Sequence, residues 1–352
     1  MPAHDAESAR RAGMSGAGTG RTRRPGGKVS IYDVAERAGV SHQTVSRVIN
    51  GHPNIREATR ERVERAMAEI DYHPSGIARA LATSRTRRIG VIVDSPVQYG
   101  PSSTFRAIEE AAVDAGYGVN ALSVGDDVDL DRARVQEIDA LCVIAPRYST
   151  LSTLRARTSG VPLLLVKADP EHDVLSVAVD QYAGAVHAVD HLLELGHRRI
   201  LHLGGPRDWA DARVRARAYS ERLAAEGLDP YPPLLGDWTS DYGYRVGSDP
   251  AAIPDEVTAV FAANDQMALG LVHGFHRRGI RVPDDVSVVG FDDLPDARHF
   301  LPPLTTVRQD FHALGTLALT TLIDALEGRA PVEGRMIEPE LVVRASTAAP
   351  RG

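Results

Sequence analysis

A short polar stretch near the N-terminus carries side chains able to recognise base pairs in DNA. Gln43 can form paired hydrogen bonds with adenine, and Arg47 can do the same with the O6 and N7 atoms of guanine. The hydroxyls of Ser41 and Thr44 suit phosphate oxygens, helped by the amino-terminal end of a helix. With His42 and Ser46, these side chains form a predicted DNA-reading surface.

Three short helices must position that surface, and we expect them at residues 31–38, 42–50 and 57–70. Ser30 and the carboxylate of Asp33 form a capping-box-like start for the first helix. Gly39 supplies the turn, because glycine adopts a positive φ at little cost. Apolar residues at helical spacing close the angle between the first two helices, which predicts a helix-turn-helix. A small three-helix interaction module with a polar surface is the alternative.

A second group of polar motifs stands where predicted strands end. Residues 212–216 follow a strand at 199–203, residues 262–270 join a strand end to a helix start, and residues 289–293 end another strand. In open parallel sheets, ligands bind beyond the carboxyl ends of the strands. These motifs therefore predict a ligand site. Helix capping is the alternative for Asn264 and Asp265, and a simple loop pair is the alternative for Asp292 and Asp293.

Strand-length apolar runs alternate with helix-length amphipathic segments from residue 88 onward, which indicates parallel sheets flanked by helices. There are too many strands for one compact sheet, so we expect two doubly wound parallel-sheet α/β lobes behind the all-α head. Strands are expected at 89–94, 117–124, 140–145, 161–167, 199–203, 257–263 and 286–290, and helices at 103–115, 181–195 and 265–278.

Charge is distributed unevenly along the 352 residues. Residues 1–88 hold 16 Lys and Arg against 9 Asp and Glu, a net charge of +7, whereas the rest hold 24 against 38, or −14. A basic head on an acidic body suits a protein that presents one end to a polyanion. Residues 1–28 are predicted to be a disordered extension.

Other features of the composition narrow the class of protein. The single cysteine, Cys142, excludes an intrachain disulfide and is expected to be a buried strand thiol. The chain has neither a membrane-length apolar run nor a secretory signal, so we expect a cytoplasmic protein without a membrane partner. The 13 histidines show no metal-ligand spacing. We find no nucleophile, metal cluster or phosphate loop, so we expect neither an enzyme nor a cofactor.

Residues 29–50 and 66–74 resemble the head of the lac repressor family almost residue for residue, and the resemblance extends to about residue 347. It implies that His42, Gln43 and Arg47 face base edges, and Asn50 completes the predicted DNA-binding set. Arg56 stands where the family commonly has a Ser or Thr cap on the third helix, which leaves Asn54 as a substitute cap.

The connector at residues 74–82 is similar to the family's hinge helix, with a plain linker as the alternative. The resemblance assigns Ala78 and Leu81 to the minor groove, with Leu81 as a wedge between base pairs. Nine residues do not sustain a helix alone in water, so the hinge is expected to fold only against its dimer mate and DNA.

The body resembles the family's core, which is similar to periplasmic sugar-binding proteins. The resemblance implies two lobes joined by three crossovers, with the ligand between them. Arg215, Asn264 and Asp292 would then converge on an effector, with Trp238 as an apolar wall. Phe311 and Gln309 would also reach the pocket in this interpretation. A guanidinium, an amide and a carboxylate together match the vicinal hydroxyls of a polyol.

Five segments follow from these observations. Residues 1–28 are the extension, 29–73 the helix-turn-helix domain, and 74–87 the hinge and linker. The core covers 88–348, with lobe 1 at about 88–179 and 310–338, and lobe 2 at about 180–308 and 339–348.

The expected function is a sequence-specific DNA-binding transcription regulator. We expect a homodimer on a pseudo-palindromic operator in double-stranded DNA, repressing carbohydrate-utilisation genes until a sugar effector releases it. The alternative is the same fold responding to a nucleobase or a phosphorylated sugar as corepressor. A sugar-transport component and an enzyme on the same scaffold are the rival classes.

Overall fold

The computed structural model describes residues 29–50, 52–73, 85–93, 97–123, 138–145, 160–166, 175–329 and 335–351. The chain forms two compact units, which join between residues 84 and 85. The predicted extension at 1–28 and most of the predicted hinge lie outside the described residues.

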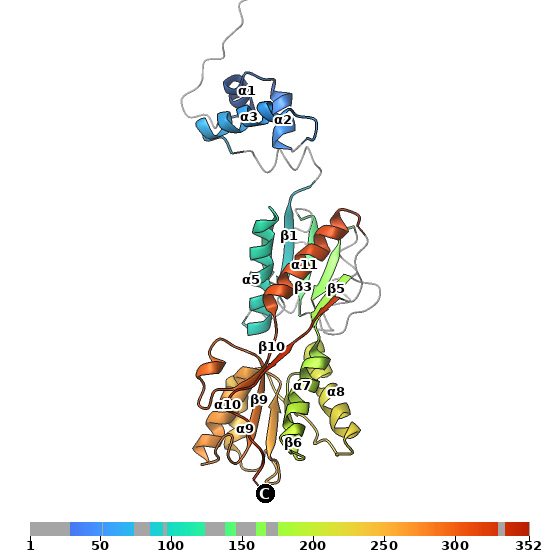
Figure 1. Ribbon diagram of the computed structural model, residues 1–352, viewed down its shortest axis with the longest axis vertical. Coiled ribbons are helices and arrows are strands. Elements are labelled where there is room, and N and C mark those ends of the chain that lie inside the picture. Colours follow the sequence, from blue (N-terminus) through green and yellow to red (C-terminus); the bar gives the residue numbers. More distant parts are fainter. Residues whose placement is uncertain are drawn as a thin grey trace, which may run out of the picture. The chain divides into compact units, whose positions relative to one another are not determined.

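In the described part of the first unit, three helices pack around a small apolar core (Figure 1). Ser30 and Asp33 form the expected capping box, and Gly39 ends the first helix with a φ of 64°. Val34, Val45 and Val63, one from each helix, have no exposed surface. The helices are α1 (Ile31–Ala38), α2 (His42–Ile49) and α3 (Glu57–Glu69).

The start of α3 differs from the suggested substitute cap. Arg56 occupies the N-cap position, and no side chain caps the helix there. Asn54 therefore does not replace the missing Ser or Thr. The ion pair of Arg37 with Glu69 instead fixes α1 against α3 near the opposite end of α3.

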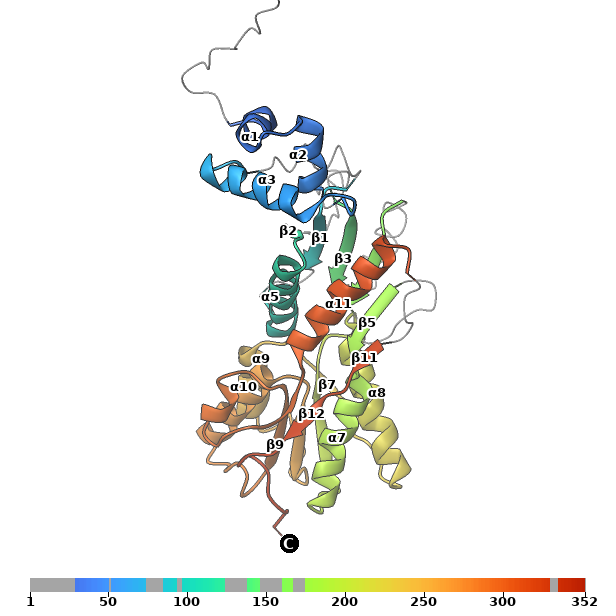
Figure 2. The same ribbon diagram turned by 45° about the horizontal axis from the view of Figure 1, so that its top comes forward.

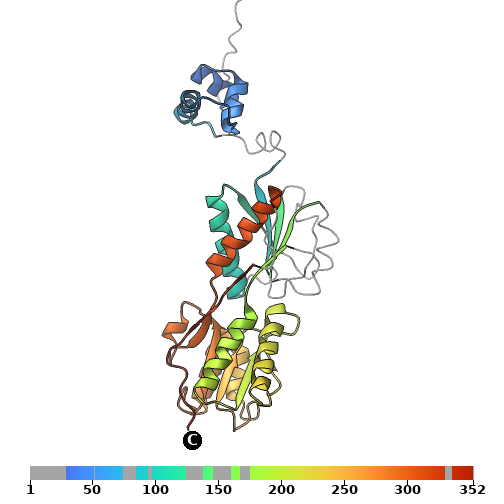
Figure 3. The same ribbon diagram turned by 45° about the vertical axis from the view of Figure 1, so that its right-hand side comes forward.

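The second unit contains two six-stranded sheets, the first of which is parallel throughout. Its strand order is β11-β5-β4-β3-β1-β2. Helices α5 (Tyr99–Asp114) and α11 (Phe311–Leu326) lie side by side on one face (Figure 3). Cys142 is buried in β3, as expected. The strands are β1 (Arg88–Val93), β2 (Gly118–Ser123), β3 (Ala140–Ile144), β4 (Leu163–Val166), β5 (Leu175–Val179) and β11 (Arg335–Ile337).

The second sheet has the order β12-β10-β9-β8-β6-β7 and is parallel except at one edge, where β12 runs antiparallel to β10. A 3₁₀ turn at Ala297–His299 follows β9. The strands are β6 (Ile200–Gly204), β7 (Leu234–Leu235), β8 (Ala259–Ala262), β9 (Ser287–Asp292), β10 (Thr305–Arg308) and β12 (Glu340–Val342). The helices are α7 (Gln181–Glu194), α8 (Ala210–Ala225), α9 (Ser240–Ser248) and α10 (Asp265–Arg277).

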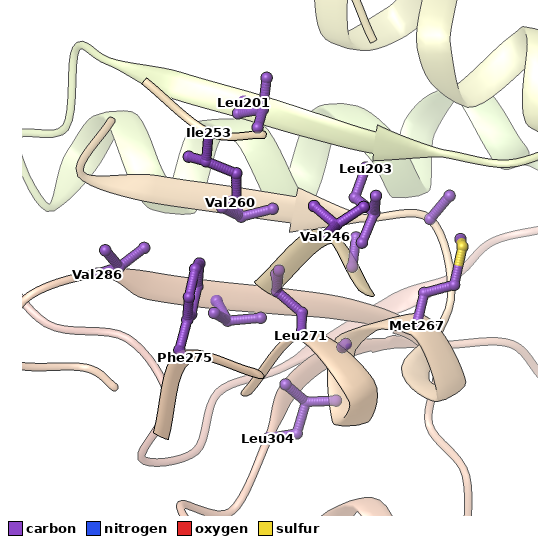
Figure 4. Close-up of a cluster of buried hydrophobic side chains, with 14 of the residues drawn as sticks. Leu201, Leu203, Val246, Ile253, Val260, Met267, Leu271, Phe275, Val286 and Leu304 are labelled. Carbon is purple, nitrogen blue, oxygen red and sulfur yellow. The ribbon is translucent and has the colours of Figure 1, made fainter. Parts of the chain in front are cut away.

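Alternating strand residues cover the two faces of this second sheet. Leu201 and Val260 point toward α9 and α10, where they meet Leu271 and Phe275 (Figure 4). Their strand neighbours, such as Phe261, point to the other face and pack on α7 and α8. Both faces are therefore apolar, which explains why the central strand β8 is a continuous hydrophobic run.

Helices α9 and α10 touch through their backbones. A Cβ added to Gly243 would lie 2.0 Å from the carbonyl oxygen of Met267, and one added to Gly270 would lie 1.8 Å from that of Ser240. No larger residue fits at either position, so these glycines permit the close approach.

The chain passes between the two sheets three times (Figure 2). β5 is followed by α7, which packs on the second sheet; β10 is followed by α11, which packs on the first; and β11 is followed by β12. The two-lobed α/β fold is thus confirmed. None of the helices in the described ranges is both long and apolar enough to cross a membrane.

Candidate functional site

The outer side of α2 carries the predicted base-reading side chains. His42, Gln43 and Arg47 are exposed, while Val45 and Val48 on the opposite side are buried against α1 and α3. The helix therefore presents its polar side chains outward, as a recognition helix requires.

The hydroxyls at the start of α2 are partly used within the helix. The Oγ of Ser41 accepts a hydrogen bond from the backbone N–H of Thr44 at 3.1 Å and lies 2.9 Å from the Thr44 Oγ1. Asn50 is exposed beyond the last turn, and its Nδ2 donates to the Oγ of Ser46. Ser41 thus caps the helix and lies beside its amino-terminal N–H groups.

Tyr32 adjoins this surface and was missed by the sequence reasoning. Its side chain is 65% exposed, and its ring centroid lies 5.1 Å from that of His42. Its position on the first helix, away from the apolar stripe, is the signal that could have identified it. Ala78 and Leu81, predicted for the minor groove, lie outside the described residues.

A cavity lies between the two sheets of the second unit, and residues of both lobes line it. Its floor on the first sheet comes from the carboxyl ends of β3, β4 and β5, at Ile144, Val166 and Val179. All the predicted effector residues line it: Arg215, Trp238, Asn264, Asp292 and Phe311, together with Gln309.

Arg215 and Asp292 form a buried charge pair in this cavity. The Arg215 Nη2 lies 3.9 Å from the Asp292 Oδ1, and both side chains are at least nine-tenths buried. The guanidinium also lies 3.8 Å from the centre of the Phe291 ring and donates to the carbonyl oxygen of Ala263. Burial raises the pKa of Asp292 to about 6, and the charge of Arg215 opposes that rise.

Asn264 both caps a helix and supports the wall of the cavity. Its Oδ1 accepts from the backbone N–H of Met267 at the start of α10, so the capping alternative holds. Its Nδ2 donates to the carbonyl oxygen of Trp238 at 3.0 Å and to Gln266. The backbone of Trp238 has a φ of 68°, and this hydrogen bond helps to hold the strained residue in place.

Asp265 does not cap α10 with its side chain; it holds the turn after β9. Its fully buried Oδ2 accepts from the backbone N–H of Leu294 at 2.8 Å, and its Oδ1 accepts from Thr306. Asp293 in the same turn is ion-paired with Arg308 and Arg344. These bonds fix Asp292, whose φ of 110° is rare for a residue with a side chain.

Two aromatic pairs stand on different sides of the cavity. Phe311 packs edge-on to Tyr99 at a centroid distance of 5.7 Å, and Trp209 packs edge-on to Trp238 at 5.6 Å. Sequence reasoning missed Tyr99 and Trp209, because neither belongs to a motif at a strand end. The described residues contain no group of three or more His, Cys, Asp or Glu side chains suited to a metal ion.

Comparison with known proteins identifies the family. Residues 30–75 match the model of the bacterial regulatory proteins of the lacI family, and residues 189–347 match the periplasmic binding protein-like domain. The lactose operon repressor of Escherichia coli K12 is 35% identical over 329 residues, which cover 92% of this chain and 91% of the repressor. This chain belongs to the LacI family. Like other members, it is a DNA-binding transcription regulator and not an enzyme.

Other members show the same extent of similarity. A solved lac repressor dimer, bound to operator and the anti-inducer ONPF, superposes with a TM-score of 0.80 at 34% identity, over 92% of this chain and all of that one. The complex of the regulator CelR with cellobiose gives a TM-score of 0.67 at 30% identity, over 91% and 100%. The repressor PurR of Photobacterium profundum is 31% identical over 90% of this chain and 98% of its own.

Proposed function

We propose that this LacI-family member represses carbohydrate-utilisation genes as a homodimer on a pseudo-palindromic operator, and that a neutral saccharide releases it. The charges that line the cavity carry this proposal. Among the described residues that line it, the charged ones are Arg215, Asp211 and Asp292, one positive and two negative. The Arg215 guanidinium already faces Asp292, so the lining residues that the structure describes offer no unbalanced positive charge to a phosphate.

The remaining lining residues support a polyol ligand. Gln98 adds an amide to those of the predicted set, and amides both donate to and accept from hydroxyls. The aromatic pairs Tyr99–Phe311 and Trp209–Trp238 offer apolar surfaces for the C–H faces of sugar rings. A phosphorylated sugar needs excess positive charge, which this set of residues lacks.

Release by the saccharide requires that it bind one of the two arrangements of the lobes more tightly than the other. In the proposed mechanism the saccharide turns one lobe against the other, and the segment at 74–82 then loses its order on DNA. Ala78 and Leu81 would act in that segment. The exposed side chains of α2, His42, Gln43 and Arg47, would read the operator.

A saccharide screen tests the effector class. Both tryptophans of the chain, Trp209 and Trp238, line the cavity, so intrinsic fluorescence reports binding there. Neutral mono- and disaccharides, including lactose and cellobiose, should change the emission and raise the melting temperature. Glucose 6-phosphate and purine bases should do neither. A response to the phosphorylated sugar or the purines alone would overturn the neutral-saccharide proposal.

A mobility-shift assay with the DNA upstream of the gene tests the regulator itself. The protein should prefer that DNA to bulk DNA at fixed salt, and the saccharide found in the screen should weaken that preference. Sedimentation should give a dimer. No preference for any palindromic fragment would overturn the proposed operator.

A further inference from the structure

Four buried side chains form a closed ring at the base of the cavity. The Arg215 Nε donates to the Gln181 Oε1 at 2.8 Å, and the Gln181 Nε2 donates to the Gln309 Oε1 at 2.7 Å. The Gln309 Nε2 donates to the Asp292 Oδ1 at 2.6 Å, and Asp292 faces Arg215 at 3.9 Å. Each of the four residues is less than a tenth exposed.

The ring has one chemically consistent direction. A guanidinium only donates hydrogen bonds, and an ionised carboxylate only accepts them. Each glutamine between them must therefore turn its oxygen toward Arg215 and its nitrogen toward Asp292. This order fixes both amide orientations and leaves no donor facing a donor around the ring.

Two members of the ring stand in the segments that connect the lobes. Gln181 is the first residue of α7, two positions after the end of β5 on the first sheet. Gln309 lies between β10 on the second sheet and α11, which packs on the first. Arg215 and Asp292 belong to the second lobe alone, on α8 and β9. The ring therefore joins the charge pair to two of the three connections.

We infer that Gln181 and Gln309 are positioning residues, which hold Arg215 and Asp292 in register with the segments connecting the lobes. The inference rests on the proposed function only in taking Arg215 and Asp292 as effector contacts. Neither glutamine needs to touch the effector. A ligand hydroxyl that bonds to Arg215 or Asp292 competes with the ring, so binding there alters the bonds that restrain both connections.

The ring also sets the charge state of Asp292. Gln309 and Arg215 favour the ionised carboxylate, whereas burial and the charge of Asp211 favour the protonated form. Asp265 and Tyr99 also face this charge. Removal of the Gln309 amide therefore raises the pKa of Asp292. Removal of the Gln181 amide frees the guanidinium to move away, which raises the pKa in the same direction.

A pH titration of the full-length protein without effector tests the inference. Tryptophan emission should titrate with a midpoint near pH 6 in the wild type, because the Arg215 guanidinium lies 5.7 Å from the Trp238 ring and responds to the charge of Asp292. Asp292→Asn should abolish this transition. Gln309→Met should raise its midpoint by about one pH unit, the value of one hydrogen bond to a charged group.

The double variant separates a ring from two independent contacts. Gln181→Met should raise the midpoint as well, and Gln181→Met with Gln309→Met should shift it no further than the larger single shift, because either change opens the ring. Thr104→Val is the control, since Thr104 is a buried residue that lines the same cavity outside the ring. Its midpoint should equal that of the wild type.

Folding is checked by far-UV circular dichroism, and Gln→Asn variants replace any Met variant that does not fold. Unchanged midpoints in both single variants, or single shifts that add in the double variant, would overturn the inference. A wild-type protein without the Asp292-dependent transition would overturn it as well. No effector is present, so failure of the saccharide proposal leaves this result unaffected.

Discussion

The two binding regions of this regulator are built on opposite principles. On α2, the side chains predicted to read DNA are exposed, and they come from one eight-residue helix. In the cavity, Arg215, Asn264 and Asp292 are buried and bonded to other residues, and they come from three separate segments. A rigid polymer is read from outside by side chains held on a helix, whereas a small ligand needs groups fixed before it arrives.

The largest effect should come from breaking the charge pair in the cavity. Arg215→Met leaves Asp292 buried without its partner, which typically costs about 3–5 kcal/mol. Urea unfolding of the second unit, followed by tryptophan emission, should show this loss together with loss of saccharide binding. Arg217→Met is the control on the same helix. Arg217 is exposed, so its loss should cost under ~0.5 kcal/mol. An equal loss of unfolding free energy in both variants would contradict the proposed difference between the buried and the exposed arginine.

Base reading by α2 should show a smaller effect, confined to specificity. Gln43→Ala or Arg47→Ala should reduce discrimination between operator and mismatched DNA by about 1–3 kcal/mol, the value of one bidentate base contact. Competition assays at fixed salt measure it. Since both side chains are exposed, neither change should alter the melting temperature appreciably. Arg65→Ala on α3 is the control. An equal loss of discrimination in this variant would mean that α2 contributes to DNA binding through charge alone.

The buried carboxylate predicts a pH dependence that the DNA-reading surface lacks. The pKa of Asp292 in the folded protein, about 6, exceeds the ordinary value of 3.8, so the folded state binds the proton more tightly. Its ionisation therefore costs stability as pH rises through 6. Relative to Asp292→Asn, the wild type should gain about 1.3 kcal/mol of unfolding free energy between pH 7 and pH 5.

Urea titrations at both pH values test this difference. Comparison with the Asn variant is necessary because burial lowers the pKa of His202 to about 4, which acts in the opposite direction on acidification. Parallel pH profiles for the two proteins would mean that the pKa of Asp292 in the folded protein is not raised above its ordinary value.

The smallest effect concerns the cap of α2. Ser41→Ala removes the hydroxyl that accepts from the Thr44 N–H, and loss of such a cap costs about 1 kcal/mol. If residues 29–73 are prepared alone, the melting temperature of this isolated head should fall. In the full chain, circular dichroism should show helix loss beginning at a lower temperature. Ser46→Ala is the control within the same helix, because its hydroxyl does not cap it.

The head was predictable almost to the residue because its signals are local. The capping box at Ser30, the positive φ at Gly39 and the cap at Ser41 each act over a few positions, and α1 and α2 begin where these signals place them. Asn54 was wrongly suggested as a cap, because α3 begins at Glu57, as predicted, and Arg56 occupies the N-cap position without a capping side chain.

The residues that line the cavity were predictable, but their hydrogen-bond partners were not. The rule that ligands lie beyond strand ends, with the family resemblance, identified the residues that line it. The sequence order could not show that Asp265 serves the turn after β9, since its partners Leu294 and Thr306 are 29 and 41 residues away. Helix α8 was missed for a related reason, because its buried face includes Arg215, which breaks the apolar stripe. The antiparallel β12 is only three residues long and has no strand pattern of its own.

The backbone contact between α9 and α10 limits which positions of this protein can accept substitutions during evolution. With Gly243 and Gly270 pressed against neighbouring carbonyl groups, the two helices cannot slide or tilt apart without losing the whole contact. Helices α9 and α10 then behave as one rigid pair within the second lobe. Descendants with a different ligand should therefore keep both glycines while the side chains around the cavity diverge.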